Sequence, residues 1–373
     1  MPSTARRASG SVRAGVAARE PGAVHALDAK EGTFVAAPRR GGFGALFRSA
    51  LLNFATNVPG GLVMLRLALA FLALALATAS LAQESWYPSR YGADDRIGAA
   101  NNLSADTTKR AAKLVTAGKT YSLGMTTGPD SLAYPPRKFS IVITQSNDGT
   151  GPRLGENLAT ANDDILMTYM GVGSQIDGLG HLGIDHRYYN GLEAQKFVAP
   201  SGLLELGTDT IPPIATRGVL LDMAALKGVE TVPAGAAYNR AEIDAALKRE
   251  GLKIGKGDVV IFHSGWQKKP SSDPDNQKLL HPGVGVEGAK YLASLGVVAV
   301  GADTIALEVI PFENPNRPFE VHQTLLAKNG VYILENMVTG ELAADRAYEF
   351  LFVLGQPKFK GAVQAVINPI AIR

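Results

Sequence analysis

Three side chains that can bind a metal or carry a proton lie close together near the middle of the chain. Gln175 and Asp177 are two residues apart, and His181 follows after Gly178 and Gly180. If a strand runs through Asp177, the amide and the carboxylate point to the same face of the sheet. The glycines then end the strand and turn the chain, which brings the imidazole back over that face. This pattern predicts a site for a divalent metal and a proton carrier.

Two later residues extend this candidate site. His322 comes just before a helical turn, and Glu335 ends the apolar strand that follows. Strand ends in α/β folds face the crevice where ligands bind, so Gln175, Asp177, His322 and Glu335 together offer four nitrogen and oxygen ligands suited to zinc or manganese. His181 would remain free as a general acid or base. The alternative is structural: Asp177 in a turn, His322 capping its helix and Glu335 paired with a lysine.

Three further residues are candidates for binding a substrate. Tyr189 either belongs to an aromatic pocket wall or to a plain turn ending at Gly191, and His186 lies just before it. Asp303 follows an apolar strand and is either a turn residue or a carboxylate of the crevice. His263 ends a buried strand, where a structural role is favoured.

The elements around the site alternate between strands and helices with short polar connections, which indicates an α/β fold in one domain. An apolar run from Ile165 to Met170 predicts a buried strand leading into the site. We expect helices at 105–117, 239–249, 288–295 and 323–328, and strands at 121–123, 140–144, 218–222, 258–263, 297–300 and 331–335, with a β-like end at 362–372. The segment from Asn239 to Glu242 has the spacing of a capping box.

The N-terminal part differs in composition from the rest. Residues 1–63 are rich in Ala, Gly and Arg without periodicity, and we interpret them as a disordered or mis-annotated extension. Residues 64–82 combine Arg66, an apolar run and a small-x-small end, which is typical of a secretory signal peptide. The apolar run is shorter than the roughly 20 residues of a spanning helix. We therefore expect export to the periplasm or medium of a bacterium, no stable membrane anchor, and a mature domain at 83–373.

Composition excludes several classes of function. The chain has no cysteine, so disulfides, thiolate metal sites and cysteine nucleophiles are excluded. The formal net charge of +3 is positive because residues 1–82 carry +6, whereas residues 83–373 alone carry about −3. A nucleic-acid partner is therefore not expected. A P-loop is also missing from the sequence.

The order of these segments resembles the cyclase family of metal-dependent hydrolases, which includes kynurenine formamidase-like and isatin hydrolase-like enzymes. The resemblance covers nearly all of residues 90–373 and includes the stretch from Gly173 to His181. The other matching segments are Tyr91–Asp95, Asn101–Leu103, Arg217–Asp222, Gly257–Val260, Gly301–Thr304, His322 with Leu325 and Leu326, and Leu334–Asn336.

The resemblance implies a swivelling β/β/α fold, a divalent metal, a homodimer or homotetramer, and hydrolysis of a small amide or lactam. By position, Asp177, His322 and Glu335 match metal ligands and His181 matches the catalytic histidine. Gly171 and Gln175 stand where the family pattern has two further histidines, so one ion is expected rather than two. The leading hypothesis is an exported hydrolase of a C–N bond in a small, aromatic amide, formamide or lactam. The alternative is a periplasmic small-molecule binding protein with a degenerate metal site.

Overall fold

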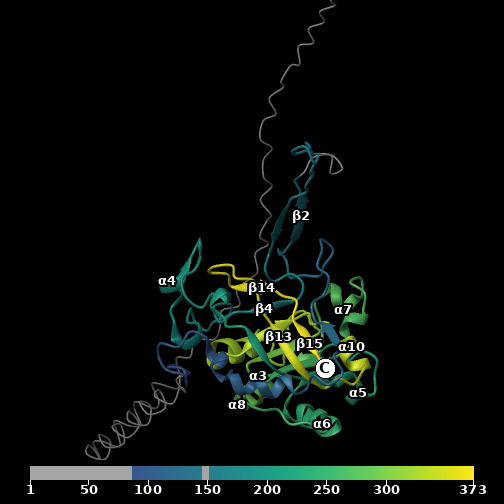
Figure 1. The fold of residues 1–373 in the computed structure, drawn as a ribbon. Coiled ribbons are helices and arrows are strands. Elements are labelled where there is room, and N and C mark those ends of the chain that lie inside the picture. The colour runs from purple at the N-terminus through teal and green to yellow at the C-terminus, as the bar shows by residue number, and fades with distance from the viewer. Residues whose placement is uncertain (1–85, 145–150) are drawn as a thin grey trace, which may run out of the picture. The chain divides into compact units, whose positions relative to one another are not determined.

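The computed structural model describes residues 86–144 and 151–373, all within a unit that spans Glu84 to Arg373 (Figure 1). The extension at 1–63 and the signal peptide at 64–82 lie outside the described residues. In the part of the chain that the structure describes, no helix has the length and apolar content needed to cross a membrane.

A nine-stranded mixed sheet forms the centre of this unit. Its order is β1-β15-β13-β7-β9-β11-β12-β4-β14, and the four strands from β7 to β12 are parallel while the outer pairs are antiparallel. The strands are β1 (Thr120–Ser122), β4 (Gln175–Asp177), β7 (Ile214–Asp222), β9 (Val259–His263), β11 (Ala299–Ala302), β12 (Tyr332–Glu335), β13 (Glu349–Leu354), β14 (Gln364–Val366) and β15 (Ile370–Ile372).

The central strands β9, β11 and β12 are buried along their length, and most of their side chains are apolar on both faces. Every residue of β9 and β11 is buried, as expected for parallel strands covered on two sides. The helices are α3 (Ala105–Ala112), α4 (Ala194–Phe197), α5 (Met223–Lys227), α6 (Arg240–Glu250), α7 (Pro274–Gln277), α8 (Val286–Ser294), α9 (Glu320–His322) and α10 (Gly340–Ala344), with a π-helical segment η5 (Gln323–Lys328). The mixed α/β architecture in one domain is the one expected from the sequence.

Local sequence signals explain where several helices begin and end. Asn239 and Glu242 form the capping box expected at the start of α6, and Gly251 ends that helix in the left-handed conformation. Ser104 caps α3 through the backbone N–H of Thr107. This helix ends at Ala112, five residues before the expected boundary, because the chain continues in turns.

The prediction that the strand at 165–170 is buried is wrong. Strand β3 (Asp164–Thr168) pairs only with β2 (Phe139–Ile143), and the two form a ribbon that extends away from the central sheet (Figure 1). Leu166 is 54% exposed and Met167 is 65% exposed. An apolar run alone cannot distinguish a core strand from an exposed ribbon, because its burial depends on what packs against it.

Candidate functional site

The candidate site is built across three neighbouring strands of the central sheet. Gln175 of β4 lies directly opposite Glu335 of β12, and Asp177 lies opposite Gln364 of β14. Because directly opposite residues share a face, this register brings their polar side chains together. Gln175 Nε2 donates to Glu335 Oε2 at 2.7 Å and to Asp177 Oδ1 at 3.2 Å, while Gln364 Nε2 donates to Asp177 Oδ1 at 2.7 Å.

His322 enters the same cluster from α9. Its Nε2 lies 3.2 Å from Glu335 Oε1 and 3.7 Å from Asp177 Oδ2, and its Nδ1 contacts a carboxylate oxygen of Glu308. Burial alone would lower the pKa of His322, but the hydrogen bonds to Glu308 and Glu335 raise it to about 10. Burial, together with the charge of Asp177, raises the pKa of Glu335 to about 8. One imidazole is therefore shared among three buried carboxylates.

The residues present fit a divalent cation. One ligand atom each from Asp177, His322 and Glu335 lie within 4.8 Å of one another, and all three residues are buried. Asp177 Oδ2 is buried without a hydrogen-bond partner among the described residues, and Gln175 Oε1 shares that state. Buried polar atoms without partners are costly. A cation there would neutralise excess buried negative charge, and the nitrogen and oxygen donors suit zinc or manganese.

The amide of Gln175 faces the cluster through its nitrogen. Its two hydrogen bonds to Asp177 and Glu335 hold the carboxylates together, and its oxygen makes no hydrogen bond within the described residues. A metal ligand must present a lone pair, so Gln175 would ligate an ion only if its amide group rotated to bring the oxygen toward the cluster. Its role as a fourth ligand stays a prediction.

His181 lies beside the cluster on the turn after β4. Its Nε2 is 4.0 Å from Asp177 Oδ2, and its side chain keeps 20% of its exposure, whereas Asp177 has none. Burial lowers the pKa of His181, against an opposing effect of the Asp177 charge. A neutral imidazole that is open to a cavity and close to the ligand cluster can accept a proton near neutral pH.

A cavity of about 360 Å³ opens onto this cluster. His181, His322 and Glu335 line it, and most of the remaining wall is aromatic or apolar, with Arg137 the lone lysine or arginine among the residues that line it. The other aromatic lining residues are Tyr134, Tyr169 and Phe319. A volume of this size accommodates a one- or two-ring molecule.

All three expected substrate-binding residues lie outside the lining of this cavity. Tyr189 is buried, and its hydroxyl contacts Asp95 Oδ2 at 2.6 Å and Ser89 Oγ at 2.5 Å, which fastens the segment 89–95 to η2 (Tyr189–Gly191). His186 is exposed in a turn and has a positive φ of 59°. Neither residue lines the cavity at His181.

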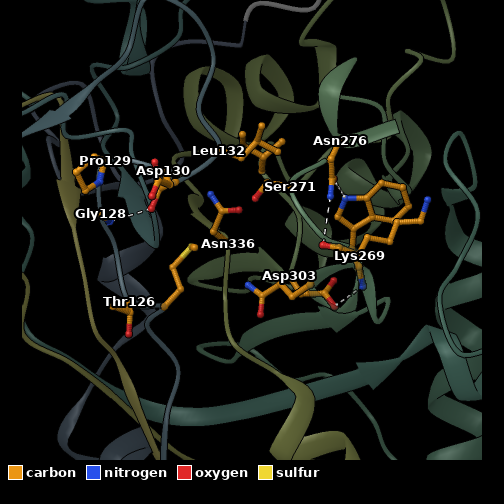
Figure 2. Close-up of a pocket in the computed structure, with 15 residues that line it drawn as sticks. Thr126, Gly128, Pro129, Asp130, Leu132, Lys269, Ser271, Asn276, Asp303 and Asn336 are labelled. Atoms are coloured by element: carbon orange, nitrogen blue, oxygen red, sulfur yellow. Dashed lines mark hydrogen bonds between the residues drawn. The ribbon is translucent and has the colours of Figure 1, made fainter. Parts of the chain in front are cut away.

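Asp303 belongs to a different cavity. It lines a hollow of about 540 Å³ together with residues of the loop 125–132 and the segment 266–276. Figure 2 shows its side chain among the other lining residues. Its carboxylate accepts hydrogen bonds from the backbone N–H groups of Ser264, at 3.0 Å, and Gly265, at 2.9 Å. These bonds secure the turn after β9, and burial raises the pKa of Asp303. His263 has the expected structural setting, with its Nδ1 2.7 Å from Thr339 Oγ1.

Sequence reasoning missed three residues at the site: Glu308, Gln364 and Arg137. Glu308 and Gln364 contact His322 and Asp177 from segments with no motif of their own. Arg137 Nη1 donates to the backbone oxygen of Gly171 at 2.9 Å. The missing side chain at Gly171 was the available signal, since an empty position invites a neighbour to fill it.

Comparison with known proteins adds an independent line of information. The Cyclase family model matches residues 120–309. No curated protein gives a match. A solved structure described as a novel cyclase is 28% identical, covers 76% of this chain and 96% of its own, and superposes with a TM-score of 0.68.

Two isatin hydrolases share the fold at lower identity. One, bound to the product analogue thioisatinate, is 17% identical, covers 72% of this chain and 98% of its own, and has a TM-score of 0.51. Isatin hydrolase A from Ralstonia solanacearum is 17% identical, covers 68% and 92% of the two chains, and has a TM-score of 0.52.

Proposed function

This chain belongs to the Cyclase family, and from that premise we propose that it is a metal-dependent hydrolase that cleaves a C–N bond of a small aromatic amide, formamide or lactam. The observation that carries the proposal is the buried Asp177 Oδ2, which has no hydrogen-bond partner among the described residues and lies 3.7 Å from His322 Nε2. A carboxylate in this state is suited to a cation.

Each residue of the cluster has a distinct task in the proposed reaction. Asp177, His322 and Glu335 would hold one divalent ion, and Glu308 would orient His322 through Nδ1 so that Nε2 faces the site. When bound, such an ion polarises a carbonyl group and lowers the pKa of a water molecule to about 7. His181, neutral at that pH, takes the proton of the attacking water and delivers it to the departing nitrogen.

The walls of the cavity support the proposed substrate class. Tyr134, Tyr169 and Phe319 offer aromatic faces, and a planar ring between them would lie beside His181 and Glu335. A cavity of about 360 Å³ also favours a small molecule over a polymer.

The test combines metal analysis with a substrate screen on residues 83–373 and the Asp177→Ala variant. Near-stoichiometric zinc or manganese in the wild type, lost in Asp177→Ala, is the expected result. Hydrolysis of formanilide, acetanilide or a bicyclic lactam by the loaded wild type alone is the second expected result. Wild-type protein that takes up no metal after reloading would contradict the proposal and favour a binding protein.

We further propose that copies of the chain associate through the ribbon of β2 and β3. Ile141 lies opposite Leu166 and Val142 lies opposite Ile165, so neighbouring pairs place apolar side chains on both faces of the ribbon. These four residues are 49–54% exposed. An isolated two-stranded ribbon is marginally stable in water, and exposed apolar patches of this kind mark interfaces.

Light scattering tests the association. The wild type is expected to be a dimer or tetramer, and Leu166→Lys is expected to shift it toward monomer. Val115→Lys is the control, because Val115 is 39% exposed at a site away from the ribbon. A monomeric wild type, or an unchanged oligomer in Leu166→Lys, would contradict the assignment.

The sequence from Met64 to Ala82 supports a further proposal, that the protein is exported and processed before Gln83. Mass spectrometry of the native N-terminus tests it. A native peptide from within residues 1–63 would contradict it.

A further inference from the structure

Arg137 fills the space that a side chain at position 171 would take. A methyl group added to Gly171 would lie 2.7 Å from Arg137 Cζ and closer still to Nη1. The same methyl group would lie 2.9 Å from Gln364 Oε1, the side chain that holds Asp177. The guanidinium therefore stands at the edge of the carboxylate and imidazole cluster, in a place that only a glycine at 171 leaves open.

The guanidinium of Arg137 has little to bind within the protein. Among the described residues, its one hydrogen bond is from Nη1 to the Gly171 oxygen at 2.9 Å, and it has no ion pair. Four of its five N–H donors are therefore available to a ligand. A half-buried cation with no carboxylate within ion-pair distance is unusual, because burying charge is costly unless the charge is paired.

A second unsatisfied donor lies beside it. The ring of Tyr134 is 6.0 Å from Arg137 Cζ, and the Tyr134 hydroxyl is buried without a hydrogen-bond partner among the described residues. Both residues line the cavity that contains His181 and Glu335. The Tyr134 hydroxyl and the N–H groups of Arg137 that have no acceptor lie in one cavity, and together they fit an anionic ligand group.

We propose that Arg137 and the Tyr134 hydroxyl form a carboxylate subsite, so that the substrate is an aromatic amide that also carries a carboxylate. The planar guanidinium can bind a carboxylate through two parallel N–H···O bonds. The aromatic walls hold the ring, and the amide carbon is then directed toward His181 and the metal ligands. The assignment of the substrate class rests on the proposed hydrolase function, whereas binding of the carboxylate does not.

The experiment measures binding rather than turnover. Isothermal titration calorimetry with benzoate and with its neutral counterpart benzamide is performed on chelator-treated wild-type protein, so that no metal ion can hold the anion. We expect benzoate to bind more tightly than benzamide, and Arg137→Gln to weaken benzoate by roughly 10- to 100-fold with little effect on benzamide. Tyr134→Phe should give a smaller loss, again only for benzoate. Lys138→Gln removes an exposed neighbouring charge and is expected to bind benzoate as the wild type does.

Gly171→Ala provides a variant that keeps the positive charge and displaces it. The backbone at Gly171 is outside the left-handed region, so alanine is compatible with the fold, but its methyl group must push aside the guanidinium and, to a lesser extent, the Gln364 amide. We expect this variant to weaken benzoate binding as Arg137→Gln does. Near-ultraviolet circular dichroism checks that each variant is folded.

Three outcomes would overturn the subsite: no binding of benzoate to the wild type, equal binding to Arg137→Gln, or equal losses for benzoate and benzamide. Failure of the proposed function has a different signature. In that case benzoate binding would still depend on Arg137, while the metal-loaded protein would hydrolyse neither neutral amides nor carboxylate-bearing ones such as 2-acetamidobenzoate.

Discussion

Replacing Glu308 by glutamine removes one buried charge from the proposed metal site and leaves the side chain almost unchanged in size. Glu308 is 3% exposed, and its carboxylate accepts from His322 Nδ1. Glutamine can still accept that hydrogen bond through its Oε1, so the imidazole should keep its orientation. The variant loses the negative charge of the carboxylate. In the wild type that charge makes His322 Nε2 a better electron donor toward a metal ion.

The expected loss of metal affinity follows from the change in this hydrogen bond. A hydrogen bond to a charged group contributes about 1.5–3 kcal/mol, against about 0.5–1.5 kcal/mol for a neutral pair. The difference of about 1–1.5 kcal/mol corresponds to a roughly 5- to 13-fold weaker zinc affinity. Substitution of a group that orients a metal ligand typically weakens metal affinity 10- to 100-fold, so about tenfold is the conservative expectation.

Competition with a chromophoric zinc chelator at pH 7.5 measures this loss. Glu287→Gln is the matched control, because Glu287 is an exposed glutamate on α8 and its variant changes the net charge equally. Zinc affinity should fall in Glu308→Gln and remain unchanged in Glu287→Gln. Equal zinc affinities for Glu308→Gln and the wild type would refute the role given to Glu308. An equal fall in both variants would mean that Glu308 acts on the ion only through long-range electrostatics.

Two further predictions concern proton transfer and pH. His181→Ala should keep its metal and lose turnover by roughly 100-fold or more, and an unchanged rate would remove His181 from the mechanism. Burial raises the pKa of Glu250, whose side chain has no exposure, to about 7. A carboxyl group with a raised pKa in the folded state destabilises the fold as pH rises from 4.5 to 7, by up to about 3 kcal/mol. Urea unfolding should therefore depend less on pH in Glu250→Gln over that range, and identical pH dependence of the two proteins would contradict this.

Periodicity and turn chemistry predicted the elements whose signals are local. The capping box at Asn239 and the apolar runs of β9 and β11 determine their own structure, and the structure contains them close to the expected boundaries. Gln175 and Asp177 lie on one strand because their spacing matches the strand repeat of two. Burial of the run at 165–170 was predicted wrongly, because it depends on partners that the sequence does not specify.

The residues of the candidate site likewise divide into those that the sequence indicated and those that depend on tertiary contacts. His322 and Glu335 were placed by family resemblance and the general tendency of strand ends to face a crevice, and the structure brings them together with Asp177. Glu308 and Arg137 reach the site through tertiary contacts. Glu308 is 14 residues from its partner His322 in the sequence, and Arg137 is 34 residues from its partner Gly171. No local pattern marks Glu308, and the one sign of Arg137 in the sequence is the missing side chain at Gly171, which does not say which neighbour fills the space.

The ribbon of β2 and β3 is connected directly to residues that line the cavity. Arg137 precedes β2 and Tyr169 directly follows β3, so the end of the ribbon where Phe139 pairs with Thr168 continues into the wall of the cavity. If two copies associate through their ribbons, dimer formation and ligand affinity become thermodynamically linked. If association orders the cavity wall and so favours ligand binding, specific activity should decline on dilution below the dimer dissociation constant, and a saturating ligand should restore the dimer. The protein concentration would in this way act as an effector of its own catalysis.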